Sequence, residues 1–131
     1  MENWYTAGVS LYAANILNSE NIEKWNTTIQ FLEDTLSLYE IKEYRKEPRY
    51  LLNICLLDSC LVCFKKTLDS KYQQKFKFYE ENLKDYPEKL KSDVLVQMGK
   101  AQLVFENNID ESIKLLKEGI TTDPLNYSAW I

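Results

Sequence analysis

Histidine is absent from this chain of 131 residues, and glycine and proline are scarce, with three residues each. An average chain of this length carries about 9 glycines and about 6 prolines. Without histidine a zinc site is implausible, and the shortage of glycine leaves no phosphate-binding loop and no nucleophile elbow. Few helix breakers beside abundant Leu, Lys, Glu and Tyr predict an all-α fold.

Acidic residues are the remaining candidates for catalysis. Neighbouring acids such as Glu80 with Glu81 and Asp110 with Glu111 stand near expected helix starts. Helix capping and the helix dipole account for acids at such places. A carboxylate-based enzyme is the alternative, and it needs two acids in one pocket with separated pKa values. We therefore expect no enzymatic activity and no cofactor.

Cysteine is limited to Cys55, Cys60 and Cys63, which fall within nine residues. An odd, clustered set argues against the disulfide framework of a secreted protein. A zinc site would need a fourth ligand, which the sequence does not offer nearby. Burial as small hydrophobic side chains is the favoured interpretation, and a redox or metal role is the alternative.

The charge and hydropathy of the chain restrict its partners. The net charge of −4 argues against nucleic-acid binding. The apolar run "LLNICLLDSCLVCF" is interrupted by Asn53 and Asp58 and is too short to span a bilayer, which takes about 20 residues. No signal peptide is visible. We expect a cytoplasmic protein without direct membrane insertion; the nucleus and the cytosolic face of a membrane complex are the alternatives.

Apolar spacing predicts six helices joined by short connectors. Two of the stripes are especially regular: Ile22, Trp25, Ile29, Leu32, Leu36 and Tyr39 in the second helix, and Ile109, Ile113, Leu116 and Ile120 in the sixth. The third helix, from Arg49 to about Asp69, is apolar nearly all round and should lie centrally. Ser70 with Gln73 predicts a capping box for the fourth helix, which Pro87 should stop. Asn108 or Asp110 should cap the sixth.

The three prolines, at positions 48, 87 and 124, are spaced by 39 and 37 residues. Each stands near a boundary between expected helix pairs, at roughly 3–40, 48–86 and 93–122. Residues 127–131 read as the start of a further helix. This spacing favours degenerate helix-turn-helix repeats within one domain, 1–131, and a plain α-helical bundle is the alternative.

The motifs themselves resemble the tetratricopeptide repeat, whose pattern is W-x2-L-G-x2-Y, then A-x3-F, then P. The third pair matches with Leu95, Met98, Gly99 and Gln102, then Ser112 and Leu116, then Asp123-Pro124. The first pair opens with Trp4, Ala7, Gly8 and Leu11-Tyr12, where the small residue lets paired helices approach closely. The second pair lacks the glycine. The resemblance implies a short right-handed solenoid of about three helix-turn-helix units.

Tetratricopeptide solenoids bind proteins in a groove lined by the first helix of each pair. The positions that the resemblance assigns to this groove are Tyr5, Val9, Tyr12, Val96, Gln97, Lys100, Leu103 and Val104. They are mostly apolar, with a single lysine, which disfavours the carboxylate-clamping version of the groove. A partner helix or extended segment suits such a groove better. Packing against neighbouring helices is the alternative for each residue.

The sequence thus predicts a non-catalytic protein-binding scaffold that is a subunit or N-terminal part of a larger assembly. A faint similarity to the tetratricopeptide subunit of the ER membrane protein complex points the same way. Trp130 and Ile131 are bulky and apolar where a solenoid needs a polar cap. We expect Trp130 to contact a continuation of the solenoid, the last helix pair or a second copy. A homo-oligomerising α-bundle is the alternative function.

Overall fold

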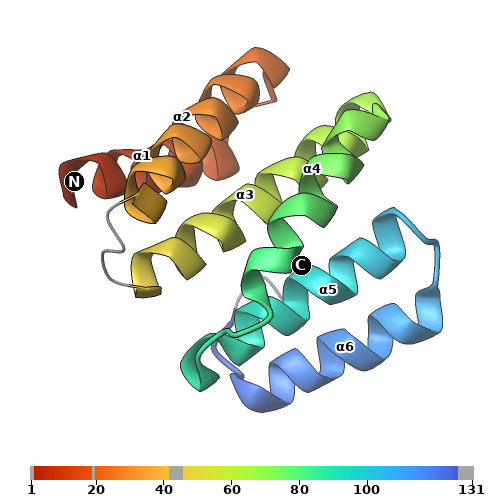
Figure 1. Ribbon diagram of the computed structural model, residues 1–131. Helices are drawn as coiled ribbons and strands as arrows, with labels where there is room; N and C mark the ends of the chain where they lie inside the picture. The colour runs from red at the N-terminus through yellow and green to blue at the C-terminus, as the bar shows by residue number, and fades with distance from the viewer. Residues whose placement is uncertain (1, 19, 42–45, 127–131) are drawn as a thin grey trace. The chain divides into compact units, whose positions relative to one another are not determined.

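The computed structural model describes residues 2–18, 20–41 and 46–126. Its α-helices are α1 (Glu2–Asn18), α2 (Ile22–Ile41), α3 (Lys46–Thr67), α4 (Ser70–Glu80), α5 (Lys91–Val104) and α6 (Ile109–Thr122). Two short 3-10 turns, Glu81–Leu83 and Glu88–Leu90, separate α4 from α5. The described part of the chain contains no strand, which confirms the all-α prediction (Figure 1).

The chain divides into two compact units, Met1–Asn82 and Leu83–Ile131. The first unit holds the pairs α1–α2 and α3–α4, and the second holds the pair α5–α6. The expected division into three repeated helix pairs, at roughly 3–40, 48–86 and 93–122, stays a prediction. The interpretation of the whole chain as one domain stays a prediction, and a helix starting at Tyr127 lies outside the described residues.

Helix α3 is the centre of the first unit, as its apolar composition predicts. It contacts α1, α2 and α4. Nearly every side chain from Leu52 to Leu61 is buried, and so is Cys63. Pro48 lies in its first turn, where a missing backbone N–H costs nothing because that group has no partner within the helix.

Two predicted features of α4 are wrong. The N-cap is Asp69, whose extended backbone (φ −81°, ψ 122°) lets its carboxylate accept from the backbone N–H of Lys71, so Ser70 is the first helical residue. The helix also ends at Glu80 rather than running on to Pro87. Asn82 then donates to Asn53 of α3 from the following 3-10 turn, at 3.1 Å.

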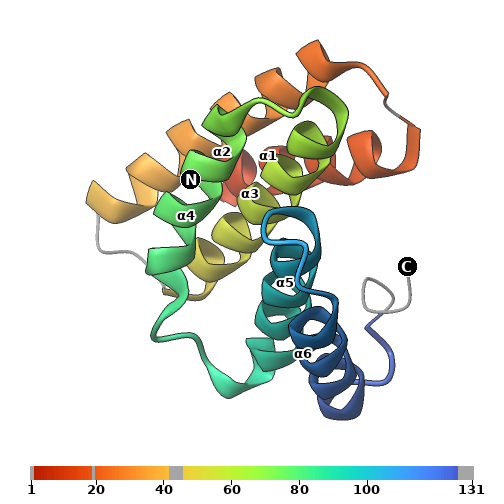
Figure 2. The same cartoon turned by 90° about the vertical axis from the view of Figure 1, so that its right-hand side faces the viewer.

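In the second unit, α5 and α6 are antiparallel neighbours (Figure 2). The side chain of Asn108 caps α6 by accepting from the N–H of Glu111 at 3.1 Å, which confirms one of the two expected caps. Asn107, in the turn before it, takes the left-handed conformation (φ 52°) that asparagine tolerates well. The buried residues of α6 are Ser112 and Gly119, not its large apolar residues.

Candidate partner-binding surfaces

The first-pair residues assigned to the groove all lie on α1, and each is half-buried. The Tyr12 hydroxyl donates to Asp58 Oδ2 of α3 at 2.6 Å. The Tyr12 ring also lies edge-on to Trp25 of α2, with 6.4 Å between ring centroids. Tyr12 therefore joins α1 to both neighbouring helices. Tyr5 and Val9 share its face of α1, at spacings of seven and three residues.

A second face of α1 is anchored on α2. Trp4 stacks on Phe31 with 5.5 Å between ring centroids and 15° between ring planes. A Cβ atom on Gly8 would lie 3.1 Å from Leu32 Cδ2, which confirms that the small residue permits close approach. Further along, the buried Asn15 donates to the hydroxyl of Thr28. These contacts fix which side of α1 remains open.

The open side of α1 is uncharged. No charged residue occurs between Asn3 and Asn18. Four large apolar side chains on this helix are 40–78% exposed. The remaining exposed positions are small. We call the following exposed residues the α1 surface: Trp4, Thr6, Ala7, Ser10, Leu11, Ala13, Ala14, Ile16 and Leu17.

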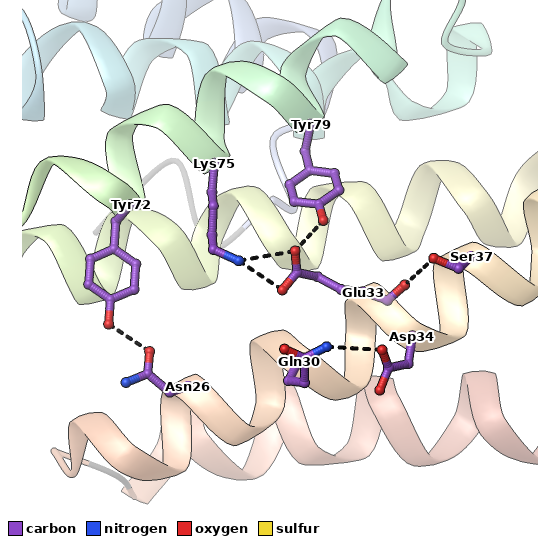
Figure 3. A network of polar contacts seen from close by, with 8 residues as sticks. All are labelled: Asn26, Gln30, Glu33, Asp34, Ser37, Tyr72, Lys75 and Tyr79. Atoms are coloured by element: carbon purple, nitrogen blue, oxygen red, sulfur yellow. Dashed lines mark hydrogen bonds and ion pairs between the residues drawn. The ribbon is translucent and has the colours of Figure 1, made fainter.

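A polar seam connects α2 and α4 (Figure 3). Tyr72 donates to Asn26 Oδ1 at 2.6 Å, and Lys75 Nζ lies 2.9 and 3.1 Å from the two carboxylate oxygens of Glu33. Glu33 also accepts from the Tyr79 hydroxyl. Glu33 is thus held by a lysine and a tyrosine, an arrangement that fastens α2 to α4. The sequence reasoning missed this seam.

The third-pair groove positions, all on α5, differ in accessibility. Val96 and Gln97 are buried, Lys100 and Val104 are half-buried, and Leu103 is 47% exposed. Val96 packs against α6, since a Cβ on Gly119 would lie 3.0 Å from its Cγ2. Gln97 Oε1 has no hydrogen-bond partner within the described residues. Only Lys100, Leu103 and Val104 therefore reach the surface.

Asn126 is a further residue that the sequence reasoning missed. Its side-chain N–H groups donate to Ser92 Oγ and Asp93 Oδ1, both at 3.0 Å, and Ser92 donates in turn to the Gly119 carbonyl at 2.8 Å. These bonds fasten the segment after α6 to the start of α5. Burial and the nearby Asp123 raise the pKa of Asp93, and the Asn126 hydrogen bond opposes that shift. The sequence feature that could have indicated this contact is the position of Asn126, three residues after Asp123.

The cysteines are buried, as predicted, and burial raises the pKa of two of their thiols. Burial, followed by the neighbouring Cys63, raises the pKa of Cys60 to about 12. Burial also raises the pKa of Cys63 to about 11, and a hydrogen bond with Tyr72 opposes that shift. Since the thiolate is the reactive form, neither side chain is activated near neutral pH. Among the described residues, no three Cys, Asp or Glu side chains are grouped so as to hold a metal ion.

Trp130, the last of the predicted contact residues, lies outside the described residues. Within the described ranges no helix is both long and apolar enough to cross a bilayer. Comparison of the chain with protein-family models, curated protein sequences and solved structures finds no match.

Proposed function

We propose that this protein is a non-catalytic interaction module that binds an apolar helix or extended segment of a partner protein on the α1 surface. The observation that carries the proposal is the exposed, uncharged face of α1. A helix that shows four large apolar side chains and no charge to water gains free energy when a partner covers it. Depletion of charge together with exposed aromatic residues is also the composition of interface cores.

The chemistry of the α1 surface indicates the chemistry of its partner. Without a charge between residues 3 and 18, the surface offers no ion pair to a ligand. Affinity must come from apolar burial, for which Leu17 on the open side and the exposed parts of Leu11 and Ile16 at its two edges are available. The small residues Ala7, Ser10 and Ala13 leave room for another helix backbone to approach. A partner helix with an apolar face fits this surface best.

The tetratricopeptide resemblance supports the broader proposal of a protein-binding module, with groove positions on α1 that border the α1 surface rather than belong to it. In the first unit α1 contacts α3, and α2 is bonded to α4 through the polar seam. Two stacked pairs of this kind are compatible with the repeat solenoid that the motifs imply. On that interpretation Tyr5, Val9 and Tyr12 are groove positions of the first unit, and Lys100, Leu103 and Val104 are groove positions of the second unit. Val96 and Gln97 are better explained as packing residues.

Within this proposal the protein is a scaffold subunit of a larger assembly. A cytoplasmic location, including the cytosolic face of a membrane complex, belongs to the same proposal. The carboxylate-enzyme alternative is not favoured, because Glu33, the carboxylate of the polar seam, already bonds to Lys75 and Tyr79.

Site-specific crosslinking tests the proposal. A photoreactive amino acid at Ala13, on the α1 surface, should crosslink one partner in native extract, whereas the same group at the exposed Gln74 of α4 should not. The partner, once identified and purified, is then titrated calorimetrically. We expect Ala13→Glu to lower its affinity at least about tenfold, because the carboxylate must be desolvated, and the matched Gln74→Glu change to alter it less than about twofold.

Salt dependence gives a second readout. Binding to an uncharged surface should change little between about 50 and 500 mM salt, because screening acts on charge pairs. A partner that crosslinks equally at both positions, or that tolerates Ala13→Glu, would contradict the proposal.

A further inference from the structure

We infer that the exposed apolar face of α6 binds the same face of a second copy of the chain, in an antiparallel contact about a twofold axis. This inference rests on α6 alone and does not depend on the proposed role of the α1 surface.

The first observation is that α6 packs on α5 through its small residues. Ser112 and Gly119 are its buried residues, and a Cβ on Gly99 of α5 would lie only 3.2 Å from the Ser112 carbonyl oxygen. The close fit on this side turns the large side chains outward. Ile109 is 55% exposed and Ile113 is 45% exposed, while Leu116 and Ile120 are half-buried. An amphipathic helix has therefore placed much of its apolar stripe in water.

The spacing of this stripe is symmetric. Its four residues, Ile109, Ile113, Leu116 and Ile120, are separated by four, three and four positions. The same intervals appear when the helix is read backwards. In an antiparallel pair, Ile109 therefore faces Ile120 of the other copy, and Ile113 faces Leu116. A twofold contact requires such self-complementarity, and a contact with an unrelated partner does not.

The charges beside the stripe are also self-complementary. Asp110 and Lys117 are exposed and are seven residues apart, so they lie on the same flank of the helix. A twofold axis perpendicular to the helices apposes this flank to itself in the reversed direction. Asp110 of each copy then lies near Lys117 of the other, which forms two opposite-charge pairs.

The size of the face sets the expected strength. One helix of 14 residues offers less than the roughly 800 Å² per partner of a standard interface. The dimer should accordingly be weak, with a Kd of about 10 µM to 1 mM. It should form reversibly and depend on protein concentration.

Sedimentation velocity of the full chain over about 5 µM to 1 mM tests the inference. We expect the wild type to shift from monomer to dimer, and Ile113→Glu to remain monomeric. Asp110→Lys and Lys117→Asp should each weaken association at least about fivefold, and the double reversal should return it to within about twofold of the wild type. Glu118→Lys, a matched charge change on the opposite side of α6, should leave association unchanged. Circular dichroism melts verify that each variant is folded.

Three results would overturn the inference. They are a wild type that is monomeric at 1 mM, a dimer insensitive to Ile113→Glu, and a double reversal that remains as weak as the single reversals. None of these results would alter crosslinking through Ala13, so failure of this inference and failure of the proposed α1 function are distinguishable.

Discussion

The buried side chains of Asn53, Asp58 and Ser59 on the apolar helix α3 each have their own hydrogen-bond partner. The buried Asn53 donates to the Arg49 carbonyl at 2.7 Å and accepts from Asn82. The buried Ser59 donates to the Cys55 carbonyl at 2.7 Å. Asp58, which is 5% exposed, accepts from Tyr12. These partners explain how α3 tolerates Asn and Asp where its neighbours are Leu and Cys, since an unsatisfied buried polar group is destabilising.

Replacing Tyr12 with Phe tests the bond to Asp58. The change removes one donor from a buried carboxyl group, and we expect the free energy of unfolding to fall by about 1–3 kcal/mol in urea denaturation. Tyr86→Phe is the control, because the half-buried Tyr86 makes no hydrogen bond within the described residues; its effect should stay within about 0.5 kcal/mol. Equal effects of the two changes would show that the Asp58 bond adds no stability.

At the scale of the elements, glycines set the separation of helices in two pairs. Gly8 brings α1 onto α2, and Gly99 brings α5 onto α6. Their surroundings differ. A Cβ on Gly8 would meet the terminal methyl of Leu32 at 3.1 Å, which a small rotation can move. A Cβ on Gly99 would meet Leu116 Cγ at 2.9 Å and the Ser112 carbonyl oxygen at 3.2 Å, and that backbone atom is fixed.

Replacing Gly8 and Gly99 in turn with alanine distinguishes the movable neighbour at Gly8 from the fixed one at Gly99. Alanine favours a helix over glycine by about 1 kcal/mol, but overpacking costs about 1–3 kcal/mol. We expect Gly99→Ala to lower the free energy of unfolding by about 1–2 kcal/mol, and Gly8→Ala to change it by less than about 0.5 kcal/mol. Chemical denaturation measures both. A stabilised Gly99→Ala variant would show that α5 and α6 can move apart without loss.

For the whole molecule, the absence of histidine and the burial of the thiols set the dependence of stability on pH. The chain has no histidine, the side chain whose ordinary pKa is near 6.5. Burial raises the pKa of the Cys60 thiol from its ordinary value of 9.0 to about 12 in the folded chain. A raised folded pKa gives a stabilising contribution that is complete below the unfolded pKa and is lost as the pH rises through the folded pKa. The affected window therefore lies above pH 9.

We accordingly expect the Tm to vary by less than about 2 °C between pH 6 and 8 and to fall above about pH 9. Differential scanning calorimetry measures both ranges. In a Cys60→Ala variant, which will be less stable at every pH, the decline above pH 9 should be shallower. A steep transition between pH 6 and 8, or immediate labelling of Cys60 by a thiol reagent at pH 8, would contradict this account of the buried thiols.

Much of the secondary structure was predictable because helix periodicity and capping are local. The six helices, the central position of α3, the close contact at Gly8 and the Asn108 cap all follow from spacings of a few residues. The prediction of Ser70 as the cap of α4 was wrong because Asp69 and Ser70 are both good N-cap residues. The extended backbone at Asp69 makes that residue the cap. The end of α4 at Glu80 was missed because no breaker occurs before Pro87.

The sequence by itself determined that the chain is helical, which residues form each stripe and where most of the turns fall, because these depend on neighbours within a few positions. Tertiary structure alone decided which side of each stripe is covered. Tyr12 meets Asp58 and Tyr79 meets Glu33 across 46 positions, and no local spacing predicts such pairs. Likewise, the close fit of Gly99 and Gly119 turned the isoleucines of α6 outward, because the smallest residues allow the closest approach of two helices.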